Sequence, residues 1–382
     1  MSAAEVAVSA EERAEMRATL RRVLEQRCDS DEVRRQLESD VGYDRGLWTE
    51  LARTFGLAGL RAPERHGGAG FTMAETAMVA EELGRTLYGG PFLSHTLAIE
   101  TILEAGTDEQ HATLLPDLAG GERTAALAMT SPEGDATEDG SVRWRGQDGG
   151  VRLDGVASYV IDGHTAEQLV VAAAPAGSAE TPRLFVVDAT HLERRLLPTM
   201  DPTRKLAEIH FAATPASPLG DGHDTRSPLA AVLDRATLIL AAEMLGGASR
   251  CLEMAVDYAK VRRQFGRTIG SFQAIKHKLA DMLIAVESAR SVIEHAATPG
   301  VGDDPEEAAY LASLAKVAAC QAYELCAQDN IQIHGGIGFT WEHDAHLHLR
   351  RASSGRILLG TPEQHRERVT ALLGVSTAKE QP

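Results

Sequence analysis

The sequence predicts an α+β fold in which a helical segment is followed by short strands and then by long helices. Apolar residues recur at helical spacing up to about residue 118. Short β-rich runs separated by Gly, Pro and Asp continue to about residue 219, and helical spacing then returns. With 382 residues, the chain has room for two or three such units. We therefore expect a helical domain at 1–118, a β domain at 119–224 and a four-helix bundle at 225–382.

The N-terminal segment contains three stretches with the signals of helices. Residues 10–27 are charged and periodic, and residues 43–56 form a shorter amphipathic stretch. The third stretch begins at Thr72, directly after the glycine-rich RHGGAGF, and Glu75 follows three residues later. A Thr followed by Glu at this distance is typical of a capping box, so we expect a helix to begin there.

The middle segment consists of short β-rich runs between turn-forming residues. The runs are TAALAMT, SVRWRG, VRLDGVASYVI, EQLVVAA, RLFVVD and AEIHFAA. Strands of this length and spacing are typical of an antiparallel barrel or sandwich.

Three long helices and one shorter helix are expected in the C-terminal segment. The long ones cover about 229–263, 271–297 and 304–336, and the shorter one begins near Pro362. An Asp-Pro pair opens the third helix and Gly335 with Gly336 ends it. Helices that are apolar along one face assemble into a bundle.

Composition excludes several classes of function. The chain has 38 Lys and Arg against 55 Asp and Glu, a formal net charge of −17, which disfavours nucleic acids and anionic membranes as partners. The N-terminus lacks the pattern of a secretory signal, and the longest apolar stretch, 229–245, contains three charged residues, so we expect no membrane span. The four cysteines are scattered, as is usual in a reducing cytoplasm.

No metal site is expected, although histidines gather near the C-terminus. His334, His343, His346 and His348 lie close to Glu342. They follow a Gly-Gly break and alternate with apolar residues, which is more typical of surface or interface packing than of converging ligands.

Two segments carry residues suited to binding. Residues 258–282 place Arg262, Arg263 and Arg267 around a Phe-Gly break in an acidic chain, which suits a phosphate or carboxylate ligand, although pairing with surface acids is an alternative. Residues 329–352 place three glycines within four positions after a long helix, which allows a ligand to approach the backbone. A helix end followed by a turn is an equal alternative.

These two segments resemble the C-terminal signatures of the acyl-CoA dehydrogenase family, in FGRTIGSFQAIKHKLADM and QIHGGIGFTWEH. APERHGGAGFTMAETAMVAEELG is similar to a glycine-rich motif of the N-terminal half, and ALAMTSPEG to the flavin-contacting strand. The resemblance covers nearly the whole chain. It implies a helical domain, a β domain, a four-helix bundle, FAD as cofactor and an oligomer.

The resemblance assigns cofactor contacts residue by residue. In the family, the FAD of one subunit is also held by its dimer neighbour, and the matching residues here are Arg262, Phe265, Gln273, Gln332, Gly335 and Gly336. Arg262 would neutralise the pyrophosphate, and the glycines would admit the adenosine half. Thr130 and Thr361 match further cofactor positions.

The half of the site around the flavin ring departs from the family's pattern. Ser131 stands where the family has Glu, and Tyr159 and Ile161 stand where it has Trp and Thr. Glu363 replaces a Gln and adds negative charge near an anionic cofactor.

The catalytic base of the family is missing at both of its usual positions. Most members place a Glu directly before a Gly-Thr pair, where this chain has Leu359. Others place the base on the first helix of the bundle, where this chain has Ala236. Neither side chain accepts a proton, and Glu243, about two helical turns beyond Ala236, is a weak substitute whose alternative is a structural role.

The resemblance leaves two main hypotheses open. In the first, the chain is the non-catalytic subunit of a heteromeric acyl-CoA dehydrogenase, an EC 1.3-type oxidoreductase of lipid metabolism and β-oxidation. It completes the FAD site of a base-bearing paralogue in a dimer of dimers. In the second, it is an active homo-oligomer that uses Glu243, and a third, weaker hypothesis is another flavin or scaffold role. The expected partners are acyl-CoA and an electron-transferring flavoprotein.

Overall fold

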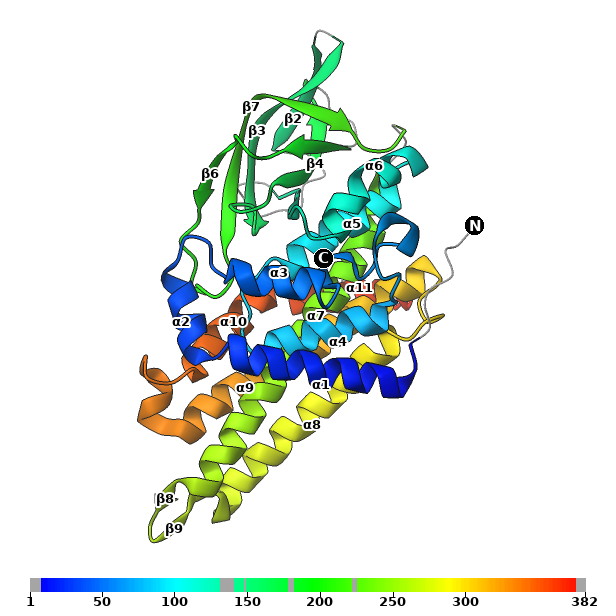
Figure 1. The fold of residues 1–382 in the computed structure, drawn as a ribbon. Coiled ribbons are helices and arrows are strands. Elements are labelled where there is room, and N and C mark those ends of the chain that lie inside the picture. Colours follow the sequence, from blue (N-terminus) through cyan, green and yellow to red (C-terminus); the bar gives the residue numbers. More distant parts are fainter. Residues whose placement is uncertain (1–7, 131–140, 148, 178–181, 222–224, 376–382) are drawn as a thin grey trace, which may run out of the picture. The chain divides into compact units, whose positions relative to one another are not determined.

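The computed structural model describes residues 8–130, 141–147, 149–177, 182–221 and 225–375 (Figure 1). The chain divides into two compact units, each discontinuous in sequence. The first contains Met1–Leu20, Asp31–Thr76 and Gly89–Leu233, and the second contains Arg21–Ser30, Ala77–Tyr88 and Asp234–Pro382. Three helices are divided between the two units, α1 (Ala10–Arg27), α4 (Met73–Arg85) and α7 (Arg226–Val261), and the first residue of α2 (Ser30–Glu38) also belongs to the second unit. Within the described ranges, no helix combines the length and apolar character needed to cross a bilayer.

Side-chain caps set the starts of several helices in the first unit. Its other helices are α2 (Ser30–Glu38), α3 (Arg45–Arg53), α5 (Phe92–Ala105) and α6 (Asp108–Ala119), with 3-10 turns η1 (Leu57–Gly59) and η2 (Glu64–His66). Asp44 accepts a hydrogen bond from the backbone N–H of Gly46 before α3. Thr107 and Gln110 form a capping box before α6. These contacts satisfy backbone N–H groups that have no partner inside the helix.

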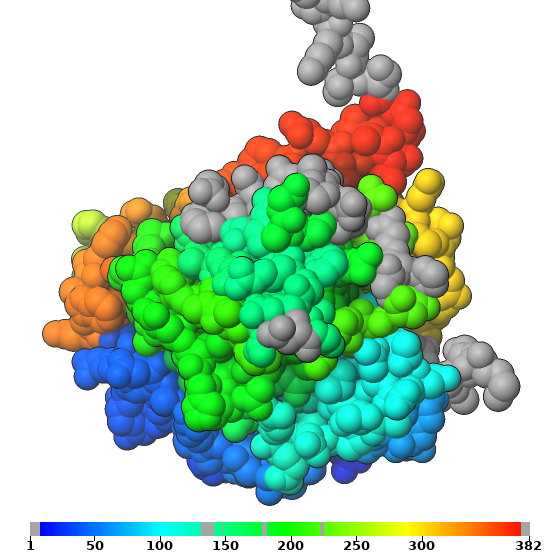
Figure 2. All heavy atoms as spheres, turned by 90° about the horizontal axis from the view of Figure 1, so that it is seen from above, coloured from blue at the N-terminus to red at the C-terminus, as the bar shows by residue number. Residues whose placement is uncertain are grey.

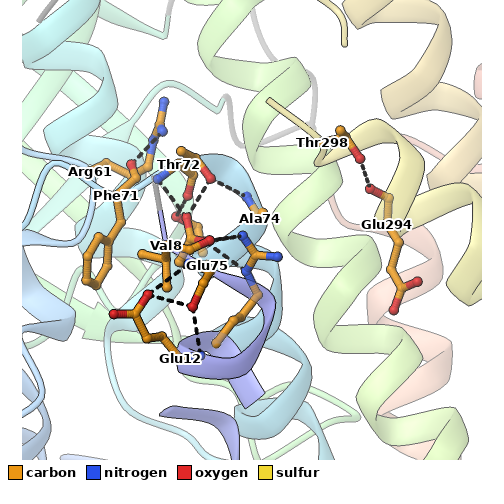
Figure 3. Close-up of polar contacts among 12 residues, drawn as sticks. Val8, Glu12, Arg61, Phe71, Thr72, Ala74, Glu75, Glu294 and Thr298 are labelled. Carbon is orange, nitrogen blue, oxygen red and sulfur yellow. Dashed lines mark hydrogen bonds and ion pairs between the residues drawn. The ribbon is translucent and has the colours of Figure 1, made fainter. Parts of the chain in front are cut away.

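The predicted cap at Thr72 is confirmed, and it is part of a larger polar group (Figure 3). A carboxylate oxygen of Glu75 accepts hydrogen bonds from the backbone N–H and the hydroxyl of Thr72, at 2.9 and 2.5 Å. The other Glu75 oxygen accepts from Arg13 of α1 at 2.8 Å. Because Glu75 is fully buried, its charge requires these partners. The start of α4 is therefore fixed to α1.

The strands of the first unit form one sheet that closes on itself. They are β1 (Ala125–Ala128), β2 (Val142–Gln147), β3 (Gly150–Ile161), β4 (Gln168–Pro175), β5 (Arg183–Asp188), β6 (Glu193–Leu196) and β7 (Leu206–Pro218). Pairing runs β4–β2–β3–β7–β5 and returns to β4, with β1 beside β4 and β6 beside β7. A closed circuit of strands is a barrel. The predicted α+β class and barrel are confirmed, although β4 pairs in parallel with β1 and β2.

The barrel is filled by its own inward side chains and flanked by a helix of the same unit. Alternate residues of β3, β4, β5 and β7, including Leu153, Val171, Phe185 and Ile209, are buried together. Helix α5, buried along most of its length, contacts β1 and β4. In Figure 2 the cyan part of the chain, near residue 100, lies beside the green part that contains the strands.

The second unit is helical. Besides parts of α1, α4 and α7, it contains α8 (Gln273–Ala296), α9 (Pro305–His334), α10 (Ala345–Ile357) and α11 (Pro362–Leu372). Helix α9 contacts α8, α10 and α11, and Asp304 caps its start as the Asp-Pro pair predicts. This arrangement confirms the predicted C-terminal bundle.

Two glycines allow α4 and α7 to touch through their backbones. A Cβ placed on Gly84 would lie 1.9 Å from the carbonyl oxygen of Glu243, and a Cβ on Gly246 would lie 1.9 Å from that of Glu81. Both distances are far inside van der Waals contact, so only glycine fits at either position. Nearby, the Arg290 guanidinium bonds Glu81 at 2.7 Å.

Several elements had no individual prediction, among them α2, α5 and α6 within the segment expected to be helical. Outside that segment, helix α10 lies where a glycine-rich break followed by histidines was expected, and β6 is a four-residue strand, ERRL, beside β7. The domain boundaries at 118 and 224 stay a prediction.

Candidate functional site

The Phe-Gly break after α7 is a β-hairpin with a two-residue turn. Strands β8 (Arg263–Gln264) and β9 (Arg267–Thr268) pair in antiparallel fashion. Phe265 and Gly266 form the turn with φ values of 51° and 75°. Positive φ at both central residues defines a type I′ turn, whose twist matches the flanking strands. The local sequence thus holds Phe265 at the tip, where it is 91% exposed.

Three arginines surround this hairpin without acidic partners. Arg262, Arg263 and Arg267 are exposed, and none forms an ion pair with a described residue. The backbone of Arg262 is fixed on both sides, because its N–H donates to Tyr258 O at 2.9 Å and its carbonyl accepts from Ile269 N at 2.8 Å. The alternative of pairing with surface acids therefore finds no support among the described residues. The group is suited to an anionic ligand.

Helix α8 begins at Gln273, after the hairpin and the 3-10 turn η3 (Ile269–Ser271). The preceding residue, Phe272, gives no side-chain cap to the helix. Its ring instead lies under the guanidinium of Arg267, 4.0 Å from ring centre to Cζ, and edge-on to Phe265 at 6.1 Å. Arg262, Phe265 and Gln273 therefore lie on one short, exposed stretch.

The glycine corner after α9 contains one glycine that the fold itself does not require. Gly335 has φ 65°, which favours glycine, whereas Gly336 has no such φ. A Cβ on either residue would meet no atom within 4 Å, while a Cβ on Gly338 would lie 3.1 Å from Ile331 O. The open space beside Gly336 fits a ligand or partner that approaches the backbone. Gln332 is exposed one turn earlier.

The C-terminal histidines are held by contacts inside the second unit. The His334 ring stacks on Tyr258 at 4.2 Å and contacts His343 at 4.1 Å, and burial lowers the pKa of His334. His348 Nδ1 and the Tyr323 hydroxyl share a hydrogen bond of 2.9 Å, and burial lowers the pKa of His348 to about 3. The described residues contain no group of three His, Cys, Asp or Glu side chains that could hold a metal ion.

In the first unit, the backbone brings Thr130 next to Tyr159. The carbonyl of Thr130 accepts from Ser158 N at 3.0 Å. The pairing of β3 with β7 shifts between Ala157 and Val160, and Tyr159 at this bulge has φ 54° and is 42% exposed. Bulges of this kind redirect a side chain at a functional site. Ser131 and Pro132 lie outside the described residues.

The two usual base positions lie on defined backbone and carry no carboxylate. Leu359 occupies the turn between α10 and α11 with φ 57°, and Ala236 is buried in α7. Glu243 lies 2.9 Å from the guanidinium of Arg351, and both side chains are largely buried. Glu243 is therefore already engaged in a largely buried ion pair within the second unit.

Two neighbouring residues have structural partners that the sequence did not reveal. Thr361 and Gln364 form a capping box at the start of α11, so the Thr361 hydroxyl already accepts one hydrogen bond. Glu363 pairs with Arg356 at 2.6 Å, and this hydrogen bond lowers the pKa of Glu363. The expected extra negative charge at Glu363 is therefore neutralised locally. Arg356 lies on α10, the helix that sequence reasoning missed.

Two family models match most of the chain. Residues 10–122 match the family model described as "Acyl-CoA dehydrogenase, N-terminal domain", and residues 228–373 match "Acyl-CoA dehydrogenase, C-terminal domain". "Acyl-CoA dehydrogenase IpdE2" of Mycobacterium tuberculosis is 36% identical over 357 residues, which are 93% of this chain and 95% of that protein.

Two solved structures are also similar. The "Tcur3481-Tcur3483 steroid ACAD" has a TM-score of 0.84 and 29% identity, covering 95% of this chain and 98% of the matched chain. The "ChsE4-ChsE5 complex from Mycobacterium tuberculosis" has a TM-score of 0.84 and 25% identity, covering 97% and 99%.

Proposed function

Because the chain belongs to the acyl-CoA dehydrogenase family, we propose that it serves the α,β-dehydrogenation of an acyl-CoA as the base-lacking subunit of a heteromeric enzyme. The observation that carries this proposal is the contrast between two regions of the chain. The residues assigned to the FAD of a dimer neighbour are present and exposed, whereas both usual base positions hold apolar side chains.

The residues of the second unit fit FAD, the cofactor of this family. Arg262, which has no ion-pair partner among the described residues, would neutralise the pyrophosphate, and Gly336 would leave room for the adenosine half. Gln273 and Gln332 would donate hydrogen bonds from exposed positions. When bound, FAD supplies the acceptor for the hydride that leaves the acyl β-carbon.

The missing base is the reason for a heteromer. Loss of a general base costs a factor of about 10²–10⁴ in rate, so the chain alone would turn over slowly. In our proposal, a paralogue carries the base and removes the α-proton beside a FAD whose site this chain completes. The two-chain dehydrogenases among the structural neighbours support such a division of labour.

Exposed apolar side chains in the second unit offer a surface for that partner. Val261 and Phe265 at the hairpin, and Leu283 and Ile284 on α8, are 50% to 91% exposed. Large apolar side chains with this much exposed surface are typical of protein interfaces. We propose a dimer of dimers in the cytoplasm, reoxidised by an electron-transferring flavoprotein.

The competing function is an active homo-oligomer that uses Glu243. The ion pair with Arg351 favours a structural role for this residue, because separating the pair would leave a largely buried charge without compensation. A third possibility, another flavin or scaffold role, predicts no turnover on acyl-CoA in any assembly.

Purification with and without the paralogue separates these functions. We expect the chain alone to show little turnover on a steroid-derived or a straight-chain acyl-CoA, and the co-expressed complex to hold one FAD per two chains. Glu243→Gln removes one partner of a largely buried ion pair and should lower the Tm, but the complex that remains folded should keep its activity, as should the control Glu253→Gln on the same helix. Stoichiometric FAD and turnover in the lone chain, abolished by Glu243→Gln in protein shown to be folded and not by Glu253→Gln, would establish the homo-oligomer instead.

A further inference from the structure

The turn that carries Leu359 is held by side chains from two neighbouring helices. Lys316, in the middle of α9, has no exposed surface, and its ammonium donates to the carbonyl oxygens of Gly355 and Leu358, the latter at 2.7 Å. These carbonyls belong to the last turn of α10 and the residue after it. A buried ammonium is costly unless it is paired, and the carbonyls at a helix C-terminus carry partial negative charge.

His365 of α11 holds the next carbonyl. Its Nε2 lies 2.9 Å from Leu359 O, and its Nδ1 lies 3.1 Å from the hydroxyl of the fully buried Ser313. A carbonyl oxygen only accepts, so Nε2 carries the proton and Nδ1 accepts from the Ser313 hydroxyl. This chain of bonds runs from α9 through α11 to residue 359.

Leu359 itself does not favour the conformation that it adopts. Its φ of 57° lies in the left-handed region, which is uncommon for a residue other than Gly, Asn or Asp. Such strain persists where the surroundings over-determine it. Here Lys316 and His365 fix the carbonyls of Leu358 and Leu359.

We propose that Lys316 and His365 are positioning residues that set the backbone of residue 359, whatever side chain that position carries. The inference rests on the proposed function, because residue 359 matters for the reaction only as the family's base position. It adds that α9 and α11 fix the backbone of the turn that carries the base in the family, in a chain that has lost the base. Leucine is then held where a carboxylate would be required.

A spin label on the turn tests this in the full chain. The four native cysteines are buried, so Leu359→Cys offers one accessible thiol for a nitroxide. We expect an immobilised spectrum, and loss of the immobilised component on adding Lys316→Met or His365→Leu. Ser313→Ala, the mildest of the three changes, should give a partial loss. In the folded label-bearing chain, unchanged spectra in these variants would overturn the proposal.

Arg368→Met is the matched control. Arg368 lies on α11 one turn beyond His365 and forms a two-pronged ion pair with Asp234 of α7. Its loss should lower the Tm and leave the label immobilised, because the bonds to the turn remain. A label equally mobile in Arg368→Met and His365→Leu would show that both act through general stability, and would also overturn the proposal. The spectra require neither paralogue nor turnover, so this outcome is separate from that of the proposed function.

Discussion

Two alanine substitutions at glycines should have opposite effects on folding and on cofactor binding. Gly246→Ala places a methyl group 1.9 Å from the Glu81 carbonyl oxygen, whereas Gly336→Ala places one where no atom lies within 4 Å. The first site is a backbone contact between α4 and α7. The second is the open corner assigned to the adenosine half of FAD.

The expected change in the free energy of unfolding is set by two opposing contributions, helix propensity and steric overlap. Alanine inside a helix is worth about 1 kcal/mol over glycine. At Gly246 the clash is with backbone, so the helices must separate by more than 1 Å, at an overpacking cost of about 3 kcal/mol, the upper end for such changes. The net loss is about 2 kcal/mol, which lowers the Tm by about 4–8 °C. At Gly336 no clash opposes the gain, and the Tm should stay the same or rise slightly.

Both quantities can be measured on the same preparations. The Tm is compared on FAD-free protein, because bound cofactor would itself raise it. FAD content of the complex with the paralogue is read from the ratio of visible to 280 nm absorbance after gel filtration. We expect Gly336→Ala to lose FAD at unchanged Tm. The reasoning would be refuted if Gly336→Ala kept full FAD, or if Gly246→Ala kept the parent Tm.

Three further predictions concern charge, acid and the base. Arg262→Gln should reduce the FAD content of the complex at an unchanged Tm. If the variant and the parent kept the same amount of FAD at both low and high salt, the proposed contact with the pyrophosphate would be contradicted. Burial lowers the pKa of His95 to about 4 and that of His348 to about 3, against 6.5 in the unfolded chain. Below pH 6.5 the unfolded chain therefore binds more protons than the folded chain, and the free energy of unfolding decreases as the pH is lowered. Each histidine should remove about 2 kcal/mol between pH 7 and pH 5, and denaturant unfolding of His348→Gln should show a correspondingly smaller loss. Leu359→Glu should raise acyl-CoA turnover of the lone chain supplied with FAD by at least about tenfold, measured with a dye acceptor, and Leu359→Gln should not.

Local sequence signals predicted much of the fold. The bounds of α1 agree with the charged periodic stretch at 10–27, and the Thr72 and Glu75 pair marks the start of α4. Helix α10 was missed because Gly355 and two serines interrupt an otherwise weak apolar pattern. β6 was missed because its ERRL sequence alternates no apolar residues, and pairing with β7 alone makes it a strand.

The site was predictable where it depends on nearby residues, and not where it depends on distant ones. The exposed arginines and the glycine corner follow from local motifs. The ion pairs of Glu243 with Arg351 and of Glu363 with Arg356 depend on where α10 packs. One signal was available, since Lys316 is a single lysine within the apolar run of α9, but its carbonyl partners lie some 40 residues away in sequence, at Gly355 and Leu358.

The exposed tip of the hairpin has a consequence for how the protein is made. Copies of this chain made in excess of the proposed partner keep Phe265 and Val261 exposed to water, where these side chains can bind other apolar surfaces. Unassembled copies would then be lost to self-association in proportion to their concentration. Under the proposed two-chain assembly, synthesis of the two chains in equal amounts, and not only their affinity, would therefore set the yield of the complex.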